Sequence, residues 1–259
     1  MTDRVVVITG ASSGIGAALA LQLGSRGERL VLGARRELEL GKVASRAGVH
    51  ALPVVTDVTK RKSVEHLRDV AITEFGHVDV WVNNAGRGIN KAVSELTEED
   101  VRNTVDVVLM SVLYGMQAIL PHFKERGHGH IINVSSFLGR VPITSYRSIY
   151  SASKSAVNVL SANLRMELRS KYPQIHVSVI MPGIVDTPFH DIAGPPLRAR
   201  AGESVWGTRI EAADEVAAKI VSLIDSPVAE LYMNPEAAGR VQGYFKDVAA
   251  FEESLAKRQ

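Results

Sequence analysis

The stretch that most constrains the fold is VVVITGASSGIGA, residues 5–17. Four consecutive β-forming residues are followed by Gly10, Gly14 and Gly16, and apolar residues then recur at helical spacing. This order predicts a buried strand, a glycine turn and a helix. Glycines allow a close backbone approach to a diphosphate, and the free N–H groups of a helix N-terminus attract its charge. The stretch therefore predicts a dinucleotide site, although a tight βα loop that binds nothing has the same pattern.

A second predicted strand, Arg29–Ala34, ends directly before Arg35 and Arg36. In a doubly wound sheet the carboxyl end of this strand faces the adenosine ribose. An acidic residue there would bind the 2′-hydroxyl, whereas an arginine suits a 2′-phosphate. No Asp or Glu stands between Glu28 and Glu37, so NADP(H) is favoured over NAD(H). A solvated arginine pair at the start of a helix is the alternative.

Strand-like and helix-like segments alternate along the rest of the chain. Further strands are predicted at 52–55, 78–82, 130–134, 176–180 and 230–233, and helices at about 60–75, 98–108, 109–126, 150–171 and 212–224. Seven strands separated by helices predict an α/β fold, a doubly wound parallel sheet with helices on both faces. We expect a single domain over residues 1–259. A substrate loop is expected at about 187–210, where periodicity is absent, and a C-terminal tail at about 236–259 carries an apolar helical stripe.

Composition narrows the class of protein. Of the 259 residues, 46% are hydrophobic, and the formal charge is only +2, so we expect a large core and no nucleic-acid partner. The absence of cysteine excludes disulfides, thiolate metal sites and a cysteine nucleophile. The longest uncharged stretch, Val107–Phe123, is shorter than the ~20 residues of a membrane span, and the first residues show no export signal. We therefore expect a cytoplasmic protein without a membrane anchor.

Tyr150 and Lys154 stand four residues apart in a predicted helix, hence one turn apart on the same face. At ~4 Å and an effective dielectric of ~20, a lysine charge lowers the pKa of a phenol by two or three units at most. Such a tyrosine could protonate a carbonyl oxygen as a hydride arrives, or take the proton from an alcohol. Ser136, at the end of a neighbouring strand, can donate to the same oxygen. Taken alone, this spacing is more common as a half-buried helix face.

Several motifs occur together in order: Thr9-Gly10-Ala-Ser-Ser-Gly14-Ile-Gly16, Asn83-Asn84-Ala85-Gly86, Ser136, Tyr150-x-x-x-Lys154 and Pro182-Gly183-Ile-Val-Asp-Thr187. Together they resemble the short-chain dehydrogenase/reductase (SDR) family over about residues 4–235. The resemblance implies a Rossmann-type sheet ordered 3-2-1-4-5-6-7 and a nicotinamide cofactor. It implies an oxidoreductase that interconverts a ketone or aldehyde and an alcohol, with Ser136, Tyr150 and Lys154 as catalytic residues. It also implies a homodimer or homotetramer formed through helices at about 107–126 and 150–171.

The same resemblance implies a set of cofactor contacts. Lys154 would hold the nicotinamide ribose, Ile184 and Thr187 would lie near the carboxamide, and Arg35 would meet the 2′-phosphate. Asp57 is open to two interpretations, an adenine contact or a cap for the following helix. The full set is Gly10, Ser12, Ser13, Gly14, Ile15, Gly16, Arg35, Arg36, Asp57, Val58, Asn84, Ala85, Gly86, Tyr150, Lys154, Pro182, Gly183, Ile184 and Thr187.

One residue departs from the family pattern. Val108 stands where the family often has an asparagine that helps to hold a water between the lysine and solvent, partly through its backbone carbonyl, which a valine keeps. We expect slower proton exchange without loss of hydride transfer. This departure also supports an alternative, a cofactor-binding regulatory or scaffold protein on the same fold, and an epimerase or dehydratase is a third hypothesis. No metal site is expected, because His128 and His130 lack a third ligand at a recognisable spacing, and no motif specifies the substrate.

Overall fold

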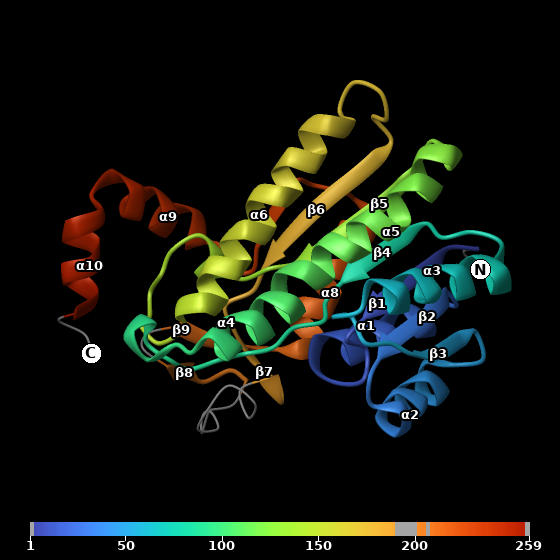
Figure 1. Ribbon diagram of the computed structural model, residues 1–259, viewed down its shortest axis with the longest axis horizontal. Coiled ribbons are helices and arrows are strands. Elements are labelled where there is room, and N and C mark those ends of the chain that lie inside the picture. The colour runs from blue at the N-terminus through green and yellow to red at the C-terminus, as the bar shows by residue number, and fades with distance from the viewer. Residues whose placement is uncertain (1–2, 190–200, 206–207, 257–259) are drawn as a thin grey trace.

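The computed structural model describes residues 3–189, 201–205 and 208–256. Its centre is a seven-stranded sheet in the spatial order β10-β6-β5-β4-β1-β2-β3 (Figure 1). All neighbouring pairs are parallel. With β10 as the seventh strand, this confirms the predicted order 3-2-1-4-5-6-7. The strands are β1 (Val5–Thr9), β2 (Arg29–Ala34), β3 (Ala51–Val55), β4 (Val80–Asn83), β5 (Gly129–Val134), β6 (Ile175–Met181) and β10 (Glu230–Tyr232).

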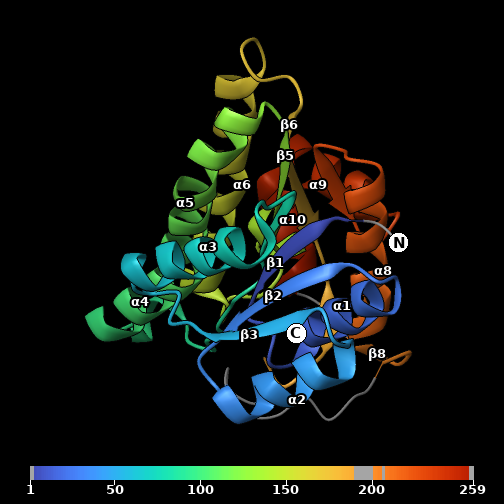
Figure 2. The same ribbon diagram turned by 90° about the vertical axis from the view of Figure 1, so that its right-hand side faces the viewer.

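Helices cover both faces of the sheet, as Figure 2 shows. On one face lie α1 (Gly14–Ser25), α2 (Glu37–Ala47) and α8 (Ala213–Asp225), and on the other lie α3 (Arg61–Phe75), α5 (Ser111–Arg126) and α6 (Ser148–Leu168).

Strand β1 divides the core in two. Val6 and Ile8 pack with α1, α2 and α8, whereas Val5 and Val7 pack with α3, α5 and α6. All four side chains are fully buried. Burial of one such side chain contributes about 1.5–3 kcal/mol. Two buried faces explain why this strand reads as an uninterrupted apolar run rather than an alternating one.

The two helices predicted at about 98–108 and 109–126 form one run with an irregular centre. α4 (Glu98–Val105) passes into a π-helical turn, Asp106–Met110, and then into α5. By length and composition alone this run is apolar enough to cross a membrane. In the structure its apolar side chains join the core, where Phe123 is fully buried. An apolar core helix therefore accounts for this composition.

The stretch expected to form a substrate loop, about 187–210, includes the short strand β8 (Ser204–Val205) and the start of β9 (Thr208–Ala212). β8 pairs with β9, and β9 runs parallel to β7 (Ile184–Asp186). The sequence did not reveal β8 and β9, because strands of two to five residues are too short to show a clear period. Residues 190–200 of this stretch lie outside the described residues.

The C-terminal tail forms two helices, α9 (Ala237–Lys246) and α10 (Val248–Ala256), at one side of the molecule (Figure 1). Its apolar stripe, including Tyr244 and Phe251, packs against Phe137, the residue that follows Ser136. The tail thereby forms one wall of the space above the carboxyl ends of the strands.

Candidate active site

The carboxyl ends of the parallel strands open into a cavity of about 1470 Å³. Among the residues predicted to bind the cofactor or to catalyse, all but Gly16 line this cavity. Two regions can be distinguished in it. We call residues 10–16 the glycine turn, and we call the surroundings of Ser136, Tyr150 and Lys154 the catalytic end.

The glycine turn is shaped by close backbone contacts. Gly10 has a φ of 69°, which other residues rarely adopt. A Cβ on Gly16 would lie 2.5 Å from the Gly10 carbonyl oxygen and 2.6 Å from Nδ2 of Asn84. Gly16 therefore acts behind the cavity wall, where it lets α1 pack against the turn. The first turn of α1 has no acidic residue, and the side chain of Ser13 makes no capping hydrogen bond. The backbone N–H groups at the start of α1 are thus available to an anion.

The Asn83-Asn84-Ala85-Gly86 motif at the end of β4 is fastened to the glycine turn. The backbone N–H groups of Asn84 and Ala85 donate to Oγ1 of Thr9, at 3.0 and 3.1 Å. The Asn84 side chain donates to the Thr9 carbonyl oxygen at 2.9 Å. These bonds fix two strand ends against each other and leave Ala85 and Gly86 on the cavity surface.

Arg36 reaches back to the glycine turn. Its Nη2 donates to Oγ of Ser12 at 3.0 Å and to Oγ of Ser13 at 2.6 Å. Arg35 lies beside it on the cavity surface and is also exposed. Two guanidinium groups and two hydroxyls thus gather where β2 ends, which is an arrangement that suits a phosphate group.

Asp57, at the end of β3, stabilises its own turn. Its Oδ1 accepts hydrogen bonds from the backbone N–H and the hydroxyl of Thr59, at 3.0 and 2.8 Å. Burial raises the pKa of Asp57, but these bonds outweigh it and leave the pKa below its ordinary value. The helix α3 has Lys60 as its N-cap and no side-chain capping bond, so the interpretation of Asp57 as a helix cap is wrong. Val58 lines the cavity beside it.

Ser136, Tyr150 and Lys154 meet at the catalytic end. Ser136 follows β5, where its Oγ accepts from the backbone N–H of Leu138 at 3.2 Å. Tyr150, on α6, is close enough for Ser136 to lower its pKa. One helical turn later, Nζ of Lys154 donates to the Val134 carbonyl oxygen at 2.7 Å. All three side chains are buried, yet each lines the cavity.

The pKa values at this end are set mainly by burial. Burial raises the pKa of Tyr150 to about 12, against the opposing effects of the Arg147 charge and the Ser136 hydrogen bond. Burial also lowers the pKa of Lys154 to about 8. The prediction that Lys154 brings the tyrosine pKa down is wrong for this arrangement, because its Nζ is bonded to a carbonyl and lies 5.8 Å from the Tyr150 ring centroid.

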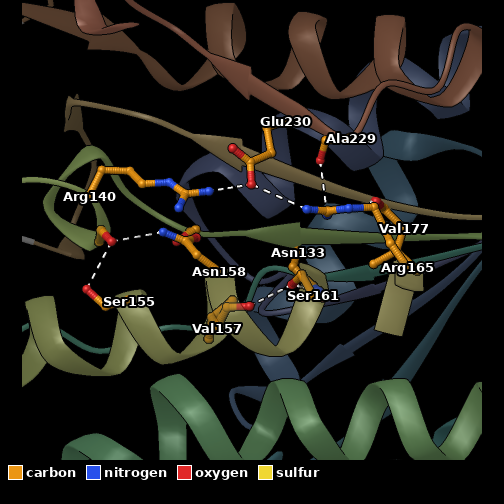
Figure 3. A network of polar contacts seen from close by, with 12 residues as sticks. Asn133, Arg140, Ser155, Val157, Asn158, Ser161, Arg165, Val177, Ala229 and Glu230 are labelled. Atoms are coloured by element: carbon orange, nitrogen blue, oxygen red, sulfur yellow. Dashed lines mark hydrogen bonds and ion pairs between the residues drawn. The ribbon is translucent and has the colours of Figure 1, made fainter. Parts of the chain in front are cut away.

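Hydrogen bonds from α6 hold the segment after Ser136 in place (Figure 3). Oγ of Ser155 and Nδ2 of Asn158 donate to the Gly139 carbonyl oxygen at 2.9 and 3.0 Å. In the same network, Glu230 from β10 is paired with Arg140, which follows Gly139, and with Arg165 of α6. These bonds connect the segment after Ser136 to α6, the helix that carries Tyr150 and Lys154.

Two residues that the sequence analysis did not single out adjoin Tyr150. Arg147 precedes it by one turn, is 9% exposed and lines the cavity. The ring of Phe189 lies 5.5 Å from the Tyr150 ring, centroid to centroid, and the Arg147 guanidinium lies 5.7 Å from the same Phe189 ring. Because Arg147 lies three residues before Tyr150, the helical spacing could have placed it on the same side of the helix. Nothing in the sequence indicated that Phe189 lies beside Tyr150.

Glu211 of β9 is a third residue that the sequence analysis did not single out. It is 7% exposed, lines the cavity, and its Oε2 accepts from the backbone N–H of Gly183 at 3.2 Å. Burial raises the pKa of Glu211 to about 7. Arg209, two residues earlier, is instead paired with Glu215. A carboxyl group that titrates near neutrality therefore lies beside the predicted nicotinamide contacts.

Val108 occupies the π-helical turn, where it is fully buried and packs with Ile89 and Tyr150. Its neighbour Val107 lines the cavity, and the Val107 backbone carbonyl oxygen accepts a hydrogen bond from Oγ of Ser111 at 2.6 Å. At position 108 the side chain thus contributes apolar packing to the tyrosine. Among the described residues there is no group of three His, Cys, Asp or Glu that could hold a metal ion.

Comparison with known proteins identifies the family. The sequence model described as short chain dehydrogenase matches residues 4–194. The chain belongs to this family. An uncharacterized oxidoreductase of Staphylococcus epidermidis is 36% identical over 187 residues, which are 72% of this chain and 80% of the relative. The family accounts for the predicted sheet order and for the position of the glycine turn.

Solved structures of SDR proteins show the same fold. The alcohol dehydrogenase of the archaeon Thermococcus sibiricus, complexed with 5-hydroxy-NADP, is 32% identical, with a TM-score of 0.77 over 88% of this chain and 95% of that one. An SDR of Burkholderia phymatum, in complex with NAD, is 27% identical, with a TM-score of 0.85 over 96% of both chains. The chain is thus an SDR oxidoreductase whose structural neighbours bind nicotinamide cofactors.

Proposed function

We propose that this SDR protein is an NADP(H)-dependent oxidoreductase that interconverts a ketone or aldehyde and an alcohol. The observation that carries the proposal is that the side chains of Ser136, Tyr150 and Lys154 line the same cavity as the glycine turn. A proton donor, an orienting hydroxyl and a dinucleotide-sized cavity are the parts that such a reaction needs.

The glycine turn fits a dinucleotide. The Gly16 position admits no side chain, the N–H groups at the start of α1 are available, and Arg35 and Arg36 line the cavity just after β2. Asp57, the acidic side chain at the next strand end, is occupied by its own turn. These features support NADP(H) over NAD(H) as the cofactor.

In the proposed mechanism, the cofactor supplies or accepts the hydride when bound. Tyr150 gives a proton to the carbonyl oxygen during reduction and takes it from the hydroxyl during oxidation. Ser136 donates to the same oxygen and holds it against the tyrosine. Lys154 would hold the nicotinamide ribose from its buried position one turn along α6. Val108 and Ile89 pack against Tyr150 and make its surroundings apolar.

Homo-oligomerisation through α5 and α6 is also proposed. On α6, Val159 and Met166 are 57% and 66% exposed, which is unusual for large apolar side chains of a helix that otherwise packs in the core. A second copy that covers them would make a dimer. Sedimentation of the purified protein tests this directly.

Two measurements test the proposed function. Titration of the protein with NADPH and with NADH, followed by nicotinamide fluorescence, should give clearly tighter binding of NADPH. A screen of carbonyl compounds should then find turnover that Tyr150→Phe lowers by about 100-fold or more while NADPH binding is kept. Binding of neither cofactor contradicts the proposal, and so does turnover that survives the loss of the hydroxyl.

A further inference from the structure

The C-terminal tail brings a cation to the cavity beside the catalytic end. Arg240 of α9 lines the cavity, and the central carbon of its guanidinium lies 5.4 Å from the centroid of the Phe137 ring. Phe137 directly follows Ser136 in the chain and lines the same cavity. One aromatic side chain therefore stands between Ser136 and the guanidinium. This contact is made by a helix outside residues 4–194, the part of the chain that matches the family model.

The charge of Arg240 is not neutralised within its own helix. Glu236 stands four residues earlier, which is the spacing at which opposite charges on a helix pair. The backbone N–H of Arg240 donates to the Glu236 carbonyl oxygen at 3.1 Å, but the Glu236 side chain is exposed. Among the described residues, Arg240 has no ion pair and no side-chain hydrogen bond. Since Arg240 is partly buried, an anion bound beside it would offset the cost of removing its charge from water.

Packing holds α9 at the edge of the cavity. Ala237, one turn before Arg240, is 3% exposed and packs in the same cluster as Phe137. Tyr244, one turn after Arg240, joins this cluster, and its ring meets that of Phe251 on α10 edge-on at 5.4 Å between centroids. The helix is thus anchored on both sides of Arg240. The guanidinium is therefore held beside the cavity by packing of the helix that carries it.

The cavity wall next to Arg240 is largely apolar. Apolar side chains from three parts of the chain line it here: Phe137, Leu138, Ile143, Met233 and Leu255. Leu255 belongs to α10, so both helices of the tail contribute to this wall. Such a surface fits a hydrocarbon or aromatic body better than a sugar.

The other cations near the catalytic end are engaged by protein groups. Lys154 donates to the Val134 carbonyl oxygen at 2.7 Å, and Arg209 is paired with Glu215. The Arg147 guanidinium lies over the ring of Phe189 at 5.7 Å. Arg240 differs from Lys154 and Arg209 in that no acidic group or carbonyl oxygen of the described chain binds it.

We propose that Arg240 binds an anionic group of the substrate, and that the substrate is a carbonyl compound with an apolar body and a carboxylate at its far end. The carbonyl would lie at Ser136 and Tyr150, the body along Phe137, and the carboxylate at the guanidinium, which can give it two parallel hydrogen bonds. The inference deepens the proposed function and rests on it for the reaction. The binding of the carboxylate itself can be measured without turnover.

The direct test compares two methyl ketones of equal chain length, 8-oxononanoate and 2-nonanone, of which only the first carries a carboxylate. Each is titrated by calorimetry into the protein without cofactor. Arg240→Gln should lower the affinity for 8-oxononanoate by about tenfold, as expected for the loss of one charge-assisted contact, and should leave the affinity for 2-nonanone unchanged. Arg240→Lys keeps the charge and should restore part of the loss. Unchanged binding of 2-nonanone also shows that the variant is folded.

Lys246→Gln is the matched control. It removes one positive charge from the same helix, but Lys246 is exposed and does not line the cavity. We expect its affinity for both ketones to equal that of the parent protein. The proposal is overturned if Arg240→Gln leaves the affinity for 8-oxononanoate unchanged, or if Lys246→Gln lowers it equally. A loss seen in Arg36→Gln instead of Arg240→Gln would place the carboxylate at the glycine turn and would overturn the proposal as well.

A kinetic measurement connects the contact to catalysis. With saturating NADPH, KM for 8-oxononanoate should rise about tenfold in Arg240→Gln, while kcat and KM for 2-nonanone stay near the parent values. Absence of turnover with both ketones, together with binding that depends on Arg240, would contradict the proposed function alone. Turnover of both ketones with the same KM values in the parent and in Arg240→Gln would contradict the role of Arg240 alone.

Discussion

The two ends of the cavity are built from different groups. At the glycine turn, the groups that face the cavity are backbone N–H groups and the hydroxyls of Ser12 and Ser13, placed by close chain contacts. At the catalytic end they are ionisable side chains, Tyr150 and Lys154, whose pKa values burial has moved in opposite directions. The shape of the glycine turn depends on how closely two backbone segments approach each other. The pKa values at the catalytic end depend on how far the side chains are buried from water.

This difference has a consequence for mutation. At the glycine turn the addition of a single methyl group should lower stability and cofactor affinity, because the turn has no free space. At the catalytic end a change of charge at nearly constant volume should have the larger effect, because the environment has a low dielectric constant. Three substitutions test this contrast.

The largest expected effect is that of Gly16→Ala. The new Cβ would lie 2.5 Å from the Gly10 carbonyl oxygen, which is backbone and cannot turn away. We expect a loss of about 1–3 kcal/mol in the free energy of unfolding and at least a tenfold loss of NADPH affinity. Denaturant unfolding and fluorescence titration measure the two effects. Gly41→Ala on α2 is the control, since its Cβ would meet nothing within 4 Å and alanine favours a helix.

A smaller, more selective effect is expected of Arg36→Gln. The substitution removes the charge that Ser12 and Ser13 hold beside the glycine turn. NADPH affinity should fall by about tenfold, as expected for one exposed charge-assisted contact, while NADH affinity changes little. Arg46→Gln, an exposed arginine at the other end of α2, should change neither affinity. Equal losses for both cofactors would contradict the assignment of this region to a 2′-phosphate.

The narrowest effect is expected of Glu211→Gln, because it concerns stability alone and depends on pH. The pKa of Glu211 rises from 4.5 to about 7 on folding, so the folded protein keeps a proton that the unfolded chain has lost. The parent protein should therefore lose stability as pH rises from 4.5 to about 7, and keep the lower value above this range. Glutamine accepts the Gly183 hydrogen bond without a charge, so the variant should be more stable by about 1–3 kcal/mol above neutrality and unchanged in acid.

Thermal unfolding at a series of pH values measures this difference. Glu252→Gln on α10 serves as the control, because it makes the same substitution at an exposed glutamate. A stability difference between Glu211→Gln and the parent protein that does not change with pH would show that water reaches the Glu211 carboxyl in the native protein. In that case the contrast between the two ends of the cavity would be weaker than burial implies.

The contrast also explains which features of the fold and the site could be predicted from the sequence. The alternation of strands and helices and the glycine turn follow from local patterns, the apolar runs and the glycine positions. The strand order and the grouping of Ser136, Tyr150 and Lys154 in one site came from the resemblance to the SDR family, and the structure places all three residues on one cavity. The sequence could not show which effect dominates their pKa values, because burial depends on Phe189, Val108 and Ile89, which come from other parts of the chain.

Other errors have similar causes. The short strands β8 and β9 carry too few residues for a visible period, and their pairing with β7 is decided by tertiary contacts. Glu211 in β9 was overlooked for the same reason, since nothing in its neighbourhood marks a carboxyl group as buried. The π-helical turn at Asp106–Met110 was predicted as a break between two helices, because a helical period continues on either side of it.

The position of β1 between two layers of helices has a further consequence for the rate and the affinity of ligand binding at the glycine turn. Opening this turn would require one layer to separate from the sheet, which is a disruption comparable in extent to global unfolding. The turn is therefore expected to be preformed, and the proposed dinucleotide would meet a surface that is already ordered. Its binding would then not lose the conformational entropy that ordering a loop costs.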